Sequence, residues 1–169
     1  MKTLVVYFSR TGENSVDGYL KVIDKGFTEI VAEKIAKKVN GKLYKLEPEV
    51  PYPSSYQATV ERSRIENENN TKVPYLNPLK SIEEYDVIYL GFPCWWRTYP
   101  RIVASFIKDH NWTNKIVYPF TTNEEGAFHL AELELKTALK GADLRKGFAC
   151  KGSEVDSIDE KLNAWLEGK

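Results

Sequence analysis

The chain has 169 residues, of which 42% are hydrophobic and 28% are charged, as in folded globular proteins and unlike disordered ones. Its 24 basic and 24 acidic residues give a net charge of zero, which argues against nucleic acid as a partner. No apolar run approaches the roughly 18 residues of a membrane-spanning helix, so no membrane partner is expected. Cys94 and Cys150 are too few for a disulfide scaffold and no secretory signal is seen, which together predict a cytoplasmic protein.

Apolar runs alternate with helical patterns in the first part of the chain. Residues 3–8 form an unbroken apolar run that predicts a buried strand. Apolar side chains then recur every four residues over 27–39 and predict an amphipathic helix, which ends at Asn40 and Gly41. A second strand follows at 43–46, and a polar helix is predicted at 56–68.

The same alternation continues to the end of the chain. Further strands are predicted at 87–92, 116–120 and, from a weaker pattern, 146–150. Helices are predicted at 100–107, 127–139 and 158–166, and Ser157 with Glu160 forms a capping box before the last one. Five strands with intervening helices predict a single domain over residues 1–169, with a parallel sheet covered by helices on both faces.

Residues 13–26 interrupt this alternation. The first strand-to-helix connection of such a sheet is normally short, yet about a dozen residues separate Gly12 from the helix. Asp17 and Gly18 form a strong turn signal, and residues 19–23 have the composition of a strand. We therefore predict a small hairpin or flap inserted here.

Three loops are expected to meet at the edge of the sheet where parallel strands end: 9–15, 93–99 and 121–127. The first is rich in hydroxyls and could seat a phosphate, although ordinary turns have a similar composition. Trp95 and Trp96 could face a flat ligand or act as hydrophobic anchors. The chain has neither a nucleotide-binding glycine motif nor a metal-ligand cluster, so no metal is expected.

The three loops resemble those of one family. Ser9-Arg10-Thr11-Gly12 follows the first strand, a Gly-x-Pro-x-Trp-Trp motif at 91–96 ends the third, and Pro-Phe-Thr-Thr at 119–122 ends the fourth. In this order they resemble the short-chain flavodoxins, and more narrowly the flavodoxin-like FMN proteins with a double-tryptophan loop. The resemblance implies a doubly wound five-stranded parallel sheet of order 2-1-3-4-5 that binds FMN non-covalently.

The resemblance also implies which residues hold the cofactor. The phosphate would lie on Ser9, Arg10, Thr11, Gly12 and Asn14, and either Asn14-Ser15 or Phe27-Thr28 would close that loop. The flavin ring would lie between two further groups, Pro93, Cys94, Trp95, Trp96, Arg97 and Thr98 on one side and Thr121, Thr122, Asn123, Glu124, Glu125 and Gly126 on the other.

Several of these residues have two interpretations. Glu124 and Arg97 could tune the flavin by charge or could simply be solvated loop residues. Cys94 could be a catalytic thiol or a small apolar residue. Phe128 is the nearest aromatic residue to the third loop, so one face of the flavin is expected to be open.

The leading hypothesis is an FMN-binding electron carrier that serves a redox partner protein. Its net charge of zero differs from the strong acidity usual in such carriers. The alternative is an NAD(P)H-dependent flavoenzyme that reduces a quinone or another small-molecule electron acceptor, which the open flavin face and the flap favour. A non-catalytic flavin-binding module is a third hypothesis. The oligomeric state cannot be predicted from the chain.

Overall fold

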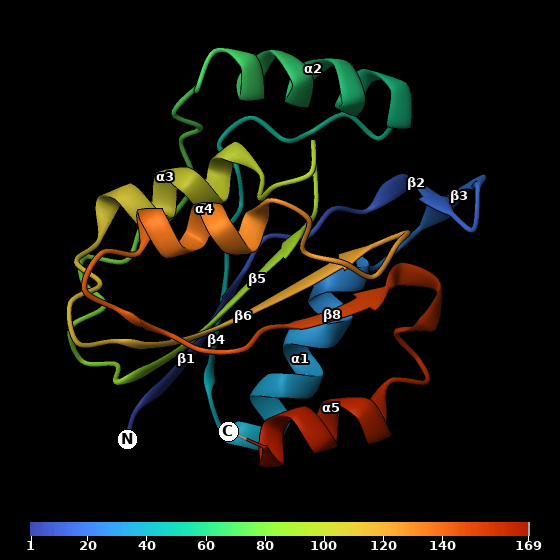
Figure 1. The fold of residues 1–169 in the computed structure, drawn as a ribbon. Coiled ribbons are helices and arrows are strands. Elements are labelled where there is room, and N and C mark those ends of the chain that lie inside the picture. The colour runs from blue at the N-terminus through green and yellow to red at the C-terminus, as the bar shows by residue number, and fades with distance from the viewer. Residues whose placement is uncertain (169) are drawn as a thin grey trace.

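The computed structural model describes residues 1–168 and is built around one parallel sheet (Figure 1). Its strands are β1 (Thr3–Tyr7), β4 (Lys42–Lys45), β5 (Val87–Pro93), β6 (Ile116–Asn123), β7 (Asp143–Leu144) and β8 (Phe148–Lys151). The sheet order is β4-β1-β5-β6-β7, and β8 also pairs with β6. The α/β flavodoxin-like architecture predicted from the sequence is therefore present.

The helices lie on both faces of this sheet. They are α1 (Phe27–Val39), α2 (Tyr56–Glu68), α3 (Arg101–Asp109), α4 (Ala131–Ala138) and α5 (Asp159–Glu167), with a short 3₁₀ turn at Gly152–Glu154. Figure 1 shows α3 and α4 on one face, α1 and α5 on the other, and α2 beyond α3 and α4. None of the helices in residues 1–168 has both the length and the apolar character needed to span a membrane.

Two apolar cores, one on each face of the sheet, explain why the strand sequences are continuous apolar runs. In β1, Leu4 and Val6 pack into the core on the α3 and α4 side, whereas Val5 and Tyr7 pack into the core on the α1 and α5 side. Successive side chains of a strand point to opposite faces, so a strand covered on both faces needs apolar residues at every position.

The sheet has six strands rather than the predicted five, and because the two hairpin strands are counted in the chain, the order is 4-1-5-6-7 rather than 2-1-3-4-5. The last position of the sheet holds two short strands, since β7 pairs with Ile116 and Val117 of β6 while β8 pairs farther along the same strand. The chain leaves the ladder between them, where Gly147 packs so closely that an added Cβ would lie 2.4 Å from the Phe128 ring. A separate hairpin adds two further strands to the chain order.

That hairpin consists of β2 (Gly12–Val16) and β3 (Tyr19–Ile23), which pair antiparallel in a sheet of their own. Its turn is formed by Asp17 and Gly18, both with positive φ (51° and 81°), as a two-residue primed turn requires. The hairpin projects beyond the main sheet in Figure 1. The base is fixed because the Glu13 carboxylate accepts the Tyr56 N–H at 2.9 Å.

Several boundaries differ from the predictions. Helix α4 begins at Ala131 rather than 127, because His129 has φ +50° and the Asn123 side chain bonds the backbone of Ala127. The capping box is also wrong, since the Ser157 hydroxyl donates to the Glu154 carbonyl at 3.1 Å and no side chain caps α5. Pro93 and residues 121–123, predicted as loop, are the last residues of β5 and β6.

Candidate functional site

A cavity lies where β1, β5 and β6 end, between the start of α1 and the hairpin. We call it the sheet-edge cavity, and it is lined by Ser9, Arg10, Asn14, Ser15, Phe27, Thr28, Tyr56, Pro93, Cys94, Trp95, Thr122, Asn123, Glu124 and Gly152. Segments that are distant in sequence meet here because all strands of the sheet are parallel and their carboxyl ends share one edge. The three predicted loops therefore do come together.

The first turn of α1 forms one end of this cavity. Its N-cap is Gly26, which has no side chain to cap the helix. An added Cβ on Gly26 would lie 2.0 Å from the Ser9 hydroxyl, which accepts the Glu29 N–H at 3.1 Å. The buried hydroxyls of Thr28 and Thr122 bond each other at 2.8 Å and join α1 to β6. A helix start with backbone donors and a positive dipole end is suited to an anion.

Arg10 lies in the cavity wall, but its terminal nitrogens are bound within the protein. Its guanidinium donates to the carbonyls of Pro53 (2.8 Å), Ser54 (2.8 Å) and Ser55 (3.2 Å), and to that of Glu13. Burial lowers the pKa of Arg10, but a guanidinium stays charged in proteins. Arg10 thus fixes the hairpin base to the segment before α2 while keeping a positive charge beside the cavity.

Glu124 fixes the other end of the hairpin. Its carboxylate accepts the Ser15 hydroxyl at 2.8 Å and the Gly18 N–H at 3.2 Å. Next to this contact, the Ser153 hydroxyl donates to the Asp17 carboxylate at 2.9 Å. The tip half of the hairpin is therefore held by three hydrogen bonds to the segments that follow β6 and β8.

The double-tryptophan segment is a tight turn. The backbones of Trp95 and Thr98 exchange two hydrogen bonds (2.9 and 3.0 Å), and the residues between them, Trp96 and Arg97, have φ values of +54° and +64°. This is a primed turn made of two residues with side chains, where each left-handed conformation costs about 1–2 kcal/mol.

The two tryptophans point in different directions. The Trp95 ring packs edge-on against Phe8 and Tyr52, with centroids 5.3 and 5.1 Å away. Trp96 is 43% exposed, and its indole N–H donates to the Ser63 hydroxyl of α2 at 3.0 Å. Trp95 is therefore the hydrophobic anchor, although it also borders the cavity, and Trp96 is the more accessible ring.

A second cavity lies between this turn and α2, and we call it the α2 cavity. It is lined by Arg10, Asn14, Tyr56, Thr59, Val60, Ser63, Cys94, Trp95 and Trp96. Arg10, Asn14, Tyr56, Cys94 and Trp95 also line the sheet-edge cavity, so the two spaces adjoin.

Not every predicted site residue lies at these two cavities. Thr11 and Gly12 line a third cavity on the β4 side of β1. Thr98 donates to the Glu134 carboxylate, and Thr121 is buried in β6 with no hydrogen-bond partner for its hydroxyl among residues 1–168. Arg97 and Gly126 line neither the sheet-edge cavity nor the α2 cavity, and no metal-binding cluster of His, Cys, Asp or Glu occurs in the described part of the chain.

The structure adds lining residues that we did not predict. Tyr56 borders both cavities from the start of α2, and Gly152 borders the sheet-edge cavity beside Phe27. No sequence signal identified Tyr56, because the polar pattern of α2 does not reveal where that helix packs. Phe128, by contrast, packs against Phe92 with ring centroids 6.3 Å apart and lines neither cavity.

Cys94 is half-buried at the point where both cavities meet. Burial raises the pKa of its thiol to about 11, and this effect outweighs the opposing influence of the Arg97 charge. The side chain is therefore a neutral thiol at physiological pH, and a neutral thiol is a poor nucleophile.

A parallel α/β sheet with a ligand cavity at the carboxyl ends of its strands is typical of nucleotide-binding proteins. The family model for flavodoxin matches residues 2–169, and the chain belongs to the flavodoxin family. No curated protein matches it.

Among solved structures, the chain is similar to a candidate flavoprotein from Bacteroides uniformis, at 29% identity and a TM-score of 0.76 over 98% of this chain and 97% of the other. A candidate flavoprotein from Bacteroides eggerthii is 28% identical, with a TM-score of 0.77 over 99% of this chain and 96% of the other. A flavoprotein from Lactobacillus acidophilus, solved in complex with FMN, is 17% identical, with a TM-score of 0.65 over 96% of this chain and 98% of the other. At this identity the likeness is one of fold alone.

Proposed function

We propose that the chain binds FMN non-covalently in the sheet-edge cavity and transfers electrons through it. The observation that carries this proposal is the first turn of α1, whose N-cap Gly26 has no side chain and whose Phe27 and Thr28 line the cavity together with Cys94 and Trp95. Membership of the flavodoxin family supports it, as does the FMN complex of the Lactobacillus protein with the same fold.

The residues present fit the parts of FMN. The first turn of α1, with Ser9 and Thr28, offers donors and a positive dipole end to the phosphate. Pro93, Cys94 and Trp95 would border one side of the ring, and residues 122–124 its other edge. When bound, FMN supplies the capacity to take up a hydride or single electrons.

Of the two redox roles, a reductase of small acceptors is favoured over a protein-to-protein electron carrier. The α2 cavity adjoins the sheet-edge cavity and provides space for a second small molecule beside the flavin. The net charge of zero also lacks the strong field that speeds encounter between charged partner proteins.

Binding of FMN and of riboflavin, followed by quenching of flavin fluorescence, tests the cofactor assignment. We expect FMN to bind much more tightly, since riboflavin lacks the phosphate that the α1 turn would hold. The FMN-loaded protein is then mixed with NADH or NADPH without oxygen, and rapid loss of the flavin absorption indicates a reductase. Slow or absent reduction indicates the carrier, and a protein that ignores FMN contradicts both roles.

Thr28→Val and Thr11→Val form a matched pair for the phosphate site. Thr28 lines the sheet-edge cavity, whereas Thr11 lines the third cavity. We expect Thr28→Val to weaken FMN binding by about 1–3 kcal/mol, as for a lost hydrogen bond to a charged group, and Thr11→Val to have little effect. Equal weakening by both would place the phosphate on the first loop, as the family resemblance implies.

A further inference from the structure

The third cavity takes no part in the proposed function. It has a volume of about 360 Å³, which is within the range of small-molecule sites. The residues that directly follow β1 and β4 line it, together with the segment before α2 and Leu76. It therefore lies at the carboxyl ends of two parallel strands, the edge at which α/β sheets bind ligands.

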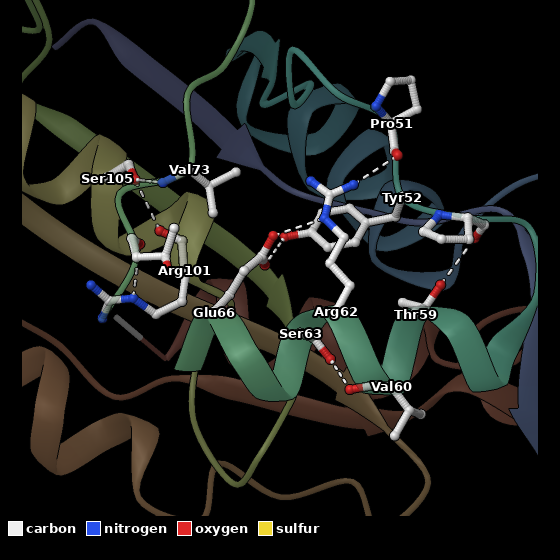
Figure 2. A network of polar contacts seen from close by, with 12 residues as sticks. Pro51, Tyr52, Thr59, Val60, Arg62, Ser63, Glu66, Val73, Arg101 and Ser105 are labelled. Atoms are coloured by element: carbon white, nitrogen blue, oxygen red, sulfur yellow. Dashed lines mark hydrogen bonds and ion pairs between the residues drawn. The ribbon is translucent and has the colours of Figure 1, made fainter. Parts of the chain in front are cut away.

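Part of the cavity wall is apolar and is fixed before any ligand arrives. The wall includes Leu46 of the buried core and Leu76, which is 45% exposed. Figure 2 shows how the Tyr52 side chain of this wall is held: its hydroxyl donates to the Glu66 carboxylate, and the Arg62 guanidinium lies 4.0 Å from its ring centre. A rigid apolar wall favours a flat, uncharged group such as a nucleobase.

The cavity also has polar side chains without a partner in the protein. Those of Thr11, Glu47 and Ser54 make no hydrogen bond and no ion pair within residues 1–168. Lys45, in contrast, is engaged by the Glu29 carboxylate at 3.2 Å. The Glu47 carboxylate is therefore free to accept hydrogen bonds from a ligand, and the hydroxyls of Thr11 and Ser54 can donate or accept them. A ribose with adjacent hydroxyls suits this set of groups.

The place of Glu47 in the fold favours the same ligand. β1, α1 and β4 form a strand–helix–strand unit, and Glu47 follows the last residue of β4 by two positions. In NAD-binding folds built from such units, an acidic residue that follows the first strand and helix accepts a ribose hydroxyl of the adenosine. The first loop of this chain lacks the glycine motif that holds the pyrophosphate in those folds, so the likeness is limited to the ribose and its base.

Arg10 connects the third cavity to the proposed flavin site, because it lines the third cavity, the sheet-edge cavity and the α2 cavity. Its terminal nitrogens donate to carbonyls, its buried Nε has no acceptor, and no carboxylate forms an ion pair with it within residues 1–168. This unpaired positive charge suits a pyrophosphate that runs from the third cavity to the flavin. Tyr52 gives a second connection, since its ring packs on Trp95 with centroids 5.1 Å apart.

We propose that the third cavity binds the adenosine end of NADH, the hydride donor of the FMN-loaded protein, and that Glu47 accepts hydrogen bonds from the ribose hydroxyls. This inference rests on the proposed function, in which NADH passes a hydride, two electrons with one proton, to the bound flavin and leaves as NAD⁺. NADPH carries a phosphate on the same ribose. Because a free carboxylate repels that phosphate, Glu47 selects NADH over NADPH.

Titration calorimetry of the FMN-loaded protein with 5′-AMP and with 2′-AMP tests the site without any turnover. 5′-AMP keeps both ribose hydroxyls, whereas 2′-AMP has a phosphate where NADPH has one, so we expect 5′-AMP to bind about tenfold more tightly. Glu47→Gln should weaken 5′-AMP binding about tenfold, as for one lost hydrogen bond to a charged group, and should reduce the discrimination against 2′-AMP. Glu49→Gln is the matched control, since Glu49 is also exposed but does not line the cavity.

Reduction of the bound flavin without oxygen tests the link to the donor. In stopped-flow measurements, Glu47→Gln should raise the apparent Kd of NADH about tenfold and leave the limiting reduction rate unchanged, because the adenosine end takes no part in hydride transfer. The preference for NADH over NADPH should shrink in Glu47→Gln and persist in Glu49→Gln. An unchanged Kd of NADH in Glu47→Gln means that the adenosine end binds elsewhere and overturns the proposal.

The same chemistry occurs in FAD, whose adenosine could occupy the cavity as part of the cofactor. The affinities of the parent protein and of Glu47→Gln for FMN and for FAD distinguish the two sources. Equal FMN affinity in both proteins, with FAD bound no more tightly than FMN, supports NADH. If FAD binds more tightly than FMN and Glu47→Gln removes this advantage, the cavity belongs to the cofactor and the proposal is overturned.

A protein that ignores FMN, or whose flavin NADH does not reduce, contradicts the proposed function, but the site can still be tested. 5′-AMP is then titrated into the protein as purified. Binding that Glu47→Gln weakens and Glu49→Gln does not supports an adenosine site, while it overturns the assignment to a hydride donor. Absence of 5′-AMP binding, or equal affinity in both variants, overturns the site itself.

Discussion

At the residue scale, the charged side chains Arg10 and Glu124 at the sheet-edge cavity use their polar atoms for hydrogen bonds within the protein. Arg10 donates to backbone carbonyls at the base of the hairpin, and Glu124 accepts from Ser15 and Gly18 at its tip. The family resemblance implied direct contacts with the cofactor for both residues. In the structure they set the shape and the charge of the cavity, and their contact with FMN stays a prediction.

The ionisation of Cys94 gives a residue-scale prediction. Burial raises the pKa of this thiol from its ordinary value of 9.0 to about 11, so the reactive thiolate is scarce near neutral pH. In a Cys150→Ser background, iodoacetamide at pH 8 should alkylate Cys94 of the folded chain at least tenfold more slowly than in the urea-unfolded chain. The folded-state rate should keep rising as the pH approaches 11. A rate that levels off near pH 7 would show a low-pKa thiolate and revive the catalytic reading.

The backbone of the tryptophan turn gives a second prediction at this scale. Arg97 has φ +64°, a conformation that glycine adopts without steric cost. Arg97→Gly should therefore stabilise the fold by about 1 kcal/mol and raise Tm by about 2–4 °C. Thr98→Gly is the control. Thr98 is not in the left-handed region, so this variant should be less stable than the parent protein. Unfolding in urea measures both, and a less stable Arg97→Gly protein would mean that the Arg97 side chain contributes more than its strain costs.

At the element scale, the hairpin is the largest departure from the simple strand-to-helix alternation. Asp17 and Gly18 predicted its turn from sequence, but nothing in the chain predicted where the hairpin would be fixed. The contacts near its tip come from residues more than a hundred positions away, Glu124 and Ser153. Such long-range contacts depend on which loops the sheet brings to its edge.

Removal of the Glu124 contact tests this attachment. In Glu124→Ala the Ser15 hydroxyl and the Gly18 N–H lose their shared acceptor, so the hairpin should open more often. We expect amide hydrogen exchange over Tyr19–Ile23 to speed up about two- to fivefold, which corresponds to a loss of about 0.5–1 kcal/mol of stability. Glu125→Ala is the matched control, because Glu125 pairs with His129 and not with the hairpin. Equal exchange in both variants would show that the tip contact is not what holds the hairpin.

At the scale of the whole molecule, the proposed FMN site joins α1, β1, β5 and β6, so cofactor binding should stabilise the entire fold. A ligand present at 100 times its Kd adds about 2.7 kcal/mol to the free energy of unfolding, which raises Tm by about 5–10 °C. Thermal unfolding with FMN should show this rise, and riboflavin at equal concentration should give a smaller one. An unchanged Tm at saturating FMN would contradict binding to the folded state.

The sequence by itself determined the layers of the fold and the three loops of the site. Apolar runs such as that in β1 predict strands buried on both faces, and parallel strands bring their carboxyl ends to one edge whatever the details of packing. This is why Ser9, Cys94 and Thr122 could be predicted to share a site, and they do line one cavity.

Only the tertiary structure decided which side chains remain available within that site. The split of the last strand, the start of α4 at Ala131 and the position of Tyr56 depend on packing between segments far apart in the chain, such as Phe128 against Gly147. The same holds for the two tryptophans, which are adjacent in the chain: Trp95 packs inward against Phe8, whereas the indole N–H of Trp96 donates to Ser63 of α2. Local sequence sets backbone preferences, whereas competition for buried space is settled only when the whole chain is folded.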